Sequence, residues 1–226
     1  MTFNFVKLPE LDFDLNAENT DKGRYYNAPN GQKYPSVTTV LSAVTDKSFL
    51  IKWQERVGEK EAKKITQKAA NRGTKLHKLS EDYLLGNLTD FKMKTLMPFD
   101  KMLFNQVRPN LDKFVTDVYC LEQALYSTQL KLAGRVDLIA RWKDKITVVD
   151  FKTSIKEKKE EWIEHYFIQC SAYATMFTEI TSLPIEDIVL VIATEEQLPQ
   201  LFERKVYNYT EKLHKYINTY HQAAPN

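Results

Sequence analysis

The clearest pattern of hydrophobic and polar positions lies in the middle of the chain. Residues 133–142 and 145–151 are rich in Val, Ile, Leu, Phe and Trp, and Lys143-Asp144-Lys145 is the only strong polar break between them. Apolar runs joined by a short polar turn predict a β-hairpin. If the hairpin is centred between Lys143 and Asp144, directly opposed residues have numbers that sum to 287, as Asp137 and Asp150 do. The pattern therefore predicts that these two carboxylates face each other.

Periodicity elsewhere predicts helices and further strands around this hairpin. The expected helices cover 48–57, 59–85, about 95–115 with an interruption at Pro109, 157–181 and 210–221, and the expected strands cover 118–127, 188–194 and 202–207. This order indicates an α/β fold whose sheet carries helices on its faces. We expect an irregular segment at 1–33 with a short hairpin near 24–33, a helical basic subdomain at 34–117, and a sheet-containing core at 118–226 that forms one compact unit with it.

Length and composition are those of one globular domain with a large helical insertion. The chain has 226 residues, of which 43% are hydrophobic, and no apolar run approaches the roughly 18 residues that span a bilayer. Residues 1–19 are acidic and lack the features of a signal or transit peptide, so we expect a cytoplasmic protein of a bacterium or a phage-infected host, without a membrane partner. The two cysteines, Cys120 and Cys170, are too few for an iron-sulfur cluster and are expected to be buried apolar residues.

Positive charge is concentrated in one segment, although the formal net charge is only +2. Residues 52–78 hold nine Lys or Arg against three Glu, and a local basic surface favours a polyanionic partner. Helical spacing places several of these cations along one stripe. An ordinary solvated helix face explains the stripe equally well. The stripe consists of Lys60, Lys64, Lys68, Arg72 and Lys75.

The opposed aspartates are the first candidate for chemistry. Like charges directly opposite each other in a hairpin are destabilising, and a hard divalent cation between them turns the repulsion into coordination. Strand alternation places Lys152 on the same face as Asp150, with Phe151 pointing into the core. A solvated salt bridge is the plain alternative for an Asp-x-Lys sequence at a strand end.

Two further residues extend this candidate site. His77 lies on the basic helix, one turn after Gly73, which would allow another backbone or a metal to approach closely. Glu122 lies on the strand before the hairpin and could supply a further ligand or hydrogen bond. A surface or satisfied core histidine and an edge-strand charge are the alternatives.

Two polar pairs are also candidates. Gln169 and Tyr173 are one helical turn apart and share a face, which ordinary helix packing would also explain. Ser36 and Thr38 stand at a helix start, where exposed amides and hydroxyls can hold a phosphate, although plain capping is equally consistent.

Taken in order, these segments resemble the RecB-like branch of the PD-(D/E)xK nucleases over roughly residues 34–195. Within that branch they look most like the mitochondrial genome maintenance exonucleases and their bacteriophage relatives. Each motif alone is weak, but the ordered set is specific. The matching motifs are Gly73-x-x-x-His77, Glu122, Gly134-x-x-Asp137, Asp150-Phe151-Lys152-Thr153 and Gln169-x-x-x-Tyr173. The residue before the first aspartate is Val136 where the family pattern has proline.

The resemblance implies a restriction-endonuclease-like mixed sheet flanked by helices and a role for each motif. His77, Asp137, Asp150 and the main-chain carbonyl of Phe151 would bind Mg²⁺ or Mn²⁺, and Lys152 would position and activate the water. The absence of a cysteine quartet points to the subgroup without an iron-sulfur cluster.

The resemblance also assigns accessory roles. Gln169 and Tyr173 would shape the site and contact substrate, and the cations of the basic helix, with Ser36 and Thr38, are candidate DNA contacts.

The function expected from these features is a divalent-metal-dependent DNA exonuclease that acts on single strands or DNA ends. Two alternatives remain open at this stage: a structure-specific endonuclease on the same fold, and a catalytically silent nucleic-acid-binding subunit.

Overall fold

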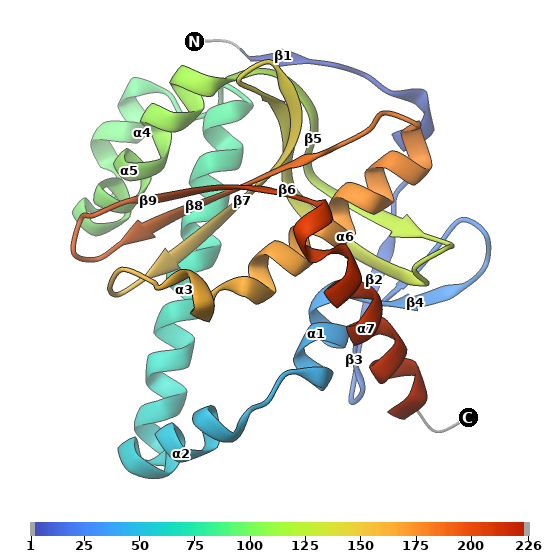
Figure 1. Cartoon of the computed structure of the whole chain (residues 1–226). Coiled ribbons are helices and arrows are strands. Elements are labelled where there is room, and N and C mark those ends of the chain that lie inside the picture. Colours follow the sequence, from blue (N-terminus) through green and yellow to red (C-terminus); the bar gives the residue numbers. More distant parts are fainter. Residues whose placement is uncertain (1–2, 224–226) are drawn as a thin grey trace.

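A six-stranded mixed sheet forms the centre of the protein in the computed structural model, which describes residues 3–223 (Figure 1). The strand order is β1-β5-β6-β7-β8-β9. Neighbouring strands are antiparallel except for β1 with β5 and β7 with β8, which are parallel. The strands are β1 (Asn4–Phe5), β5 (Val115–Ser127), β6 (Leu132–Trp142), β7 (Lys145–Ser154), β8 (Asp187–Thr194) and β9 (Gln200–Lys205). This is the mixed α/β architecture that the sequence predicts.

Helices cover both faces of this sheet. On one face, α3 (Glu59–Leu84) and α5 (Pro98–Phe114) enclose a core that includes Leu76, Phe104 and Phe151, with α4 (Asp90–Thr95) beside them. On the other face, α1 (Val37–Val44), α6 (Glu164–Thr181) and α7 (Tyr207–Ala223) pack over Val148 and its neighbours. The restriction-endonuclease-like arrangement expected from the resemblance is therefore confirmed.

The N-terminal region is more ordered than the irregular segment expected for residues 1–33. A 3-10 turn (Pro9–Leu11) precedes a small sheet of β2 (Asn16–Thr20), β3 (Gly23–Asn27) and β4 (Lys33–Pro35). The hairpin expected near 24–33 is confirmed as β3 and β4, and β2 pairs with β3 as an additional strand. The division of the chain into an N-terminal segment, a helical subdomain and a core stays a prediction.

The central hairpin has the predicted register. Trp142 pairs with Lys145 and Leu138 pairs with Val149, so opposed residue numbers sum to 287. The turn consists of Lys143 and Asp144, whose φ angles are 47° and 68°. Two consecutive positive φ angles give the turn type that matches the twist of a hairpin. The ladder ends at Leu138 and Val149, one row before the two aspartates.

Two elements differ from the sequence prediction. Helix α5 continues through Pro109, where the expected interruption does not occur. Helix α6 begins at Glu164, seven residues after the expected start, although the preceding Glu- and Lys-rich stretch favours helix. The side-chain amide of Gln200 explains this late start: it accepts from the backbone N–H of Lys158 (2.7 Å) and donates to its carbonyl (2.9 Å), so these groups are unavailable for a helix.

Helix α2 (Ser48–Val57) and the first half of α3 extend away from the sheet and its helices (Figure 1). No residue of α2 is buried, and Phe49 and Ile51 are 70% and 57% exposed. In residues 59–71, only Ala62 is buried. This projecting segment carries most of the positive charge of residues 52–78. Within residues 3–223, no helix has the length and apolarity needed to cross a membrane.

Candidate active site

Three carboxylates occupy the same row of three adjacent strands. Leu121 pairs with Leu138 and Gln123 with Val136, so Glu122 on β5 lies opposite Asp137 on β6. The hairpin register places Asp150 of β7 on the other side of Asp137. Glu122 has a φ of 47°, and it is missing from the regular ladder. Adjacent carboxylates repel one another, so this row needs positive charge close by.

The regular pleat of β6 is interrupted at Asp137. Val136 and Ile139 both belong to the core under α6, whereas Leu138 belongs to the core under α3. Strict alternation would place Val136 and Leu138 on the same face. At this step the Asp137 carboxylate accepts the backbone N–H of Phe151 through Oδ2 at 2.9 Å. The irregularity therefore directs Asp137 toward the part of β7 that carries Asp150 and Lys152.

His77 reaches this row of acids from α3. Its Nε2 is 2.8 Å from the carbonyl oxygen of Phe151, and its Nδ1 is 3.4 Å from Asp137 Oδ1 and 3.6 Å from Glu122 Oε1. The imidazole thus lies between the strand carbonyl and two carboxylates. The histidine suggested by the sequence as an isolated candidate is part of one cluster with the two acids.

Charge and burial shift the pKa values of the groups in this cluster. Burial alone lowers the pKa of His77, but hydrogen bonds to Asp137 and Glu122 outweigh it and raise the pKa to about 10. Burial raises the pKa of Asp137, but the imidazole of His77, the Lys152 ammonium and the Phe151 N–H together lower it overall. His77 and Asp137 therefore form an ion pair in the metal-free protein.

Asp150 and Lys152 form the second part of the site. The Asp150 side chain is 1% exposed, and Lys152 Nζ lies 2.5 Å from its Oδ2. Burial raises the pKa of Asp150 to about 6, with a contribution from Asp137 and opposition from Lys152. Burial lowers the pKa of Lys152, but the two aspartates raise it above its usual value, so the amine is protonated. The predicted placement of Lys152 on the face of Asp150 is confirmed by this ion pair.

The donor set fits a divalent cation. Among the described residues, neither carboxylate oxygen of Asp150 has a hydrogen bond of ordinary geometry, although both are buried and one touches Lys152. His77, Glu122 and Asp137 each offer one ligand atom, and these three atoms lie within 4.8 Å of one another. Two atoms that bind one cation at about 2.1 Å lie at most about 4.2 Å apart. The separations of the His77 imidazole from Asp137 and Glu122, 3.4 and 3.6 Å, are within this limit. The unsatisfied oxygens of Asp150 would complete the set.

Gly134 and Tyr173 are in direct contact. A Cβ built on Gly134 would lie 2.8 Å from Cε1 of Tyr173. The tyrosine is only 3% exposed, and its hydroxyl accepts a 3.1 Å hydrogen bond from the side chain of Gln169. Gly134 on β6 and Tyr173 on α6 therefore form one contact between the strand and the helix, and Gln169 lies beside it.

The remaining predicted residues lie in different environments. Ser36 is buried and caps α1, with its Oγ accepting from the backbone N–H of Thr39 (3.0 Å), and Thr38 is exposed beside it. Among the predicted basic contacts, Lys64 and Lys68 are exposed on the projecting segment. Lys75 is exposed and pairs with Asp100 at 2.9 Å.

Arg72 does not lie on an exposed stripe, contrary to the helical spacing used to place it there. Its side chain is 7% exposed and forms an ion pair with Glu195. The run of exposed cations is therefore interrupted at Arg72, which is buried, while Lys75 beyond it is exposed. Sequence spacing could not reveal this, because the partner lies 123 residues away.

One residue of the site was not among the sequence candidates. Lys152 Nζ lies 4.9 Å from the ring centre of Tyr166, which is half-buried at the start of α6. An aromatic face next to an ammonium stabilises the cation and restricts its position. Helical spacing was the available signal, because Tyr166 precedes Gln169 and Tyr173 by three and seven residues.

Comparison with known proteins agrees with this geometry. A sequence profile of the PD-(D/E)XK nuclease superfamily matches residues 52–224. The chain belongs to the PD-(D/E)XK nuclease superfamily. The match includes the carboxylate row, His77 and Lys152.

Two curated relatives are similar over most of this PD-(D/E)XK chain. Mitochondrial genome maintenance exonuclease 1 from Xenopus tropicalis is 30% identical over 182 residues, covering 75% of this chain and 50% of the relative. The protein of the same name from Homo sapiens is 28% identical over 181 residues, covering 73% and 50%. The chain thus spans about half the length of these relatives. The resemblance to exonucleases of this type is confirmed.

Solved structures give a weaker comparison. A crystal structure of a candidate exonuclease from Eubacterium rectale has a TM-score of 0.44 and 11% identity, covering 68% of this chain and 69% of that one. At this score the similarity adds nothing to the assignment, which rests on the sequence relationship and on the site.

Proposed function

We propose that this PD-(D/E)XK nuclease is a DNA exonuclease that depends on Mg²⁺ or Mn²⁺ and acts on single strands or DNA ends. The observation that carries the proposal is the carboxylate row closed by His77 on one side and Lys152 on the other. The exonuclease names of the two relatives support the same reaction.

A bound divalent cation would neutralise charge on the phosphodiester and lower the pKa of a water molecule. Asp137, Asp150 and His77 would hold it, and Glu122 lies close enough to His77 and Asp137 to share it. The Phe151 carbonyl, which contacts the same imidazole, is a further candidate ligand. Oxygen ligands suit Mg²⁺, and an imidazole among them also suits Mn²⁺.

Lys152 contributes the chain's own cation. Since its amine is protonated, it acts by donating hydrogen bonds rather than by removing a proton. Its contacts with Asp150 and Tyr166 leave the ammonium fixed beside the metal ligands, where it can orient the attacking water and stabilise negative charge on the phosphate. Preorganised charge of this kind is a major source of catalysis in phosphoryl transfer.

The projecting segment supports DNA as the polyanion. Lys64 and Lys68 are exposed there, and α2 in the same segment carries exposed apolar side chains such as Phe49 and Ile51. Basic side chains bind the phosphate backbone, and neighbouring apolar surface accommodates unstacked bases. Thr38 and Gln169, which are at least partly exposed, remain candidate contacts of the bound strand. Ser36 and Tyr173 are each 3% exposed and would instead support these neighbours. The cytoplasmic location expected from the sequence also stays a prediction.

The central test is digestion of end-labelled single- and double-stranded DNA with Mg²⁺ or Mn²⁺. The parent should release short products, and Asp150→Ala and Lys152→Ala should each lose at least about 100-fold in rate, the range of one preorganised charge. The matched controls are Glu157→Ala and Lys156→Ala, exposed residues just beyond the same strand. Equal digestion by all five proteins would refute the proposal.

Two further measurements separate the alternatives. Cleavage of a closed circular single strand would identify an endonuclease instead. Calorimetric Mn²⁺ binding that disappears in Asp137→Ala, together with DNA digestion by the parent, would exclude a silent binding subunit.

A further inference from the structure

Helix α3 is anchored by polar side chains at both borders of its buried face. At 3.6 residues per turn, Arg72 and His77 point about 140° apart around the helix axis. Leu76 and Ser80, both buried, lie between these two directions. His77 contacts the strand that carries the catalytic residues, and Arg72 contacts Glu195 on the opposite border. Two anchors so far apart fix the rotation of the helix about its own axis.

Arg72 is connected to the catalytic strand through Glu195. The backbone N–H of Glu195 donates to the carbonyl of Ser154 at 3.0 Å. Ser154 is two residues after Lys152 and pairs with Thr194 at the end of β8. The Arg72 side chain is 7% exposed and that of Glu195 is 23% exposed, so the ion pair is largely shielded from solvent. The contact therefore links α3 to the strand ends immediately beyond the site.

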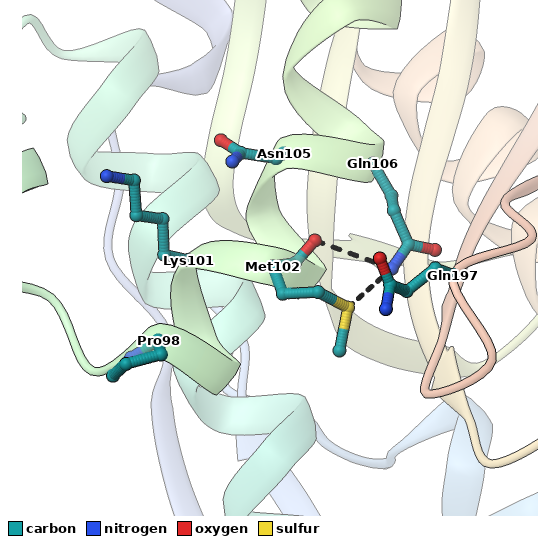
Figure 2. Close-up of a pocket in the computed structure, with 6 residues that line it drawn as sticks. All are labelled: Pro98, Lys101, Met102, Asn105, Gln106 and Gln197. Carbon is teal, nitrogen blue, oxygen red and sulfur yellow. Dashed lines mark hydrogen bonds between the residues drawn. The ribbon is translucent and has the colours of Figure 1, made fainter.

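The backbone next to Glu195, the partner of Arg72, is held in place by α5. The side-chain amide of Gln106 donates to the carbonyl of Thr194 and accepts its N–H, both at 2.9 Å. Gln106 and Gln197 are neighbours at the wall of a recess of about 380 Å³ between α5 and the loop after β8 (Figure 2). This recess lacks carboxylates in its lining and carries no chemistry of its own. Gln106 in its wall instead holds the backbone of Thr194, the residue before Glu195.

We propose that the Arg72–Glu195 pair is a positioning device for the metal ligand His77. The proposal rests on the metal-dependent function proposed above. A side-chain tip about 6 Å from the helix axis moves about 1 Å when the helix rotates by about 10°. A displacement of 1 Å can cost about 100-fold in activity when it misplaces a group in a reacting site. By fixing the rotation of α3, the pair keeps the imidazole against Phe151 and Asp137.

The test uses Arg72→Met, Arg72→Lys and the double variant Arg72→Met/Glu195→Gln in the full chain. The double variant removes both charges, which avoids leaving one unpaired. The matched control is Lys143→Met, which breaks an exposed ion pair with Glu203 at the turn between β6 and β7. For each protein, calorimetry measures the Mn²⁺ dissociation constant, and digestion of end-labelled DNA at 20 °C measures kcat and KM. Circular dichroism and thermal melting check the folding of each variant.

The Arg72→Met and double variants should bind Mn²⁺ about 10- to 100-fold more weakly, as expected when a residue supporting a metal ligand is lost. Their kcat should fall by at least about 10-fold while KM for DNA changes by less than about 3-fold, because ligand geometry and not substrate contact is altered. Arg72→Lys should recover part of both losses, and Lys143→Met should match the parent.

Three results would overturn the proposal. Unchanged Mn²⁺ affinity and kcat with a lower melting temperature would assign the pair a purely structural role. A raised KM with unchanged Mn²⁺ affinity would make Arg72 a DNA contact. If the parent binds Mn²⁺ but cuts no DNA, the proposed function fails while the Mn²⁺ comparison still decides the role of the pair. A parent that binds no Mn²⁺ would overturn both.

Discussion

The contact between Gly134 and Tyr173 leads to a stability prediction with a defined magnitude. In Gly134→Ala the new Cβ would lie 2.8 Å from Cε1 of Tyr173, whereas ordinary contacts are 3.4–4 Å. The ring must therefore move by about 0.6 Å or more, although it is 3% exposed and tightly packed. Overpacking of this kind costs about 1 to 3 kcal/mol. Loss of the hydrogen bond from Gln169 adds about 1 kcal/mol.

The expected total of about 2 to 4 kcal/mol corresponds to a fall of about 4 to 16 °C in the melting temperature of a domain this size. Thermal melts of Gly134→Ala, Tyr173→Leu and the double variant measure it. Leucine lacks both Cε1 and the hydroxyl, so adding Gly134→Ala to Tyr173→Leu should cost at most about 1 kcal/mol more, a clear departure from additivity.

Gly73→Ala is the control of opposite sign. The Cβ built there meets nothing within 4 Å, and Gly73 lies inside α3. Alanine should therefore stabilise the helix by about 1 kcal/mol. The reasoning is refuted if Gly134→Ala melts within about 1 °C of the parent, or if it costs as much in the Tyr173→Leu background as it does beside the native tyrosine.

Three further predictions concern the metal site and the thiols. In thermal melts, Mn²⁺ at about 100 times its dissociation constant should raise the melting temperature of the parent by about 5 to 11 °C. The shift should disappear in His77→Ala and persist in the control variant His165→Ala. In EDTA, the His77 ion pair should stabilise the folded protein fully below about pH 6.5 and lose this effect as the pH rises toward 10. Between pH 7 and 10, the unfolding free energy of the parent should therefore fall by a few kcal/mol more than that of His77→Gln. Parallel curves of unfolding free energy against pH would contradict this. Burial raises the pKa of Cys120 to about 12 and also raises that of Cys170. Ellman's reagent at pH 8 should therefore label neither thiol in the folded protein and both thiols in guanidinium chloride. Rapid labelling of the folded protein would contradict this prediction.

Local patterns predicted the elements whose determinants are local. The hairpin register follows from its two-residue turn, so alternation and a polar break were sufficient to align Asp137 with Asp150. The bounds expected for α2 and α3 are within one residue of those observed. Both cysteines are buried, as their number and surroundings suggested.

Features that depend on distant residues could not be predicted in the same way. The late start of α6 depends on Gln200, which lies 42 residues from the backbone groups that it binds. The burial of Arg72 depends on Glu195, and the step in β6 that directs Asp137 toward Phe151 depends on the packing of both sheet faces. Motif order brought His77 into the candidate site, but periodicity alone did not indicate that it contacts the Phe151 carbonyl.

The burial pattern along α3 has a consequence for how this single helix opens. Its C-terminal half contributes Leu76, Leu79 and Leu84 to the core, whereas only Ala62 is buried in its first thirteen residues. Backbone amides in the first half should therefore exchange with deuterium through local openings of low free energy, and those around His77 only through much rarer ones. One continuous helix would then combine a flexible segment, proposed to bind DNA, with a rigid support for His77, the proposed metal ligand.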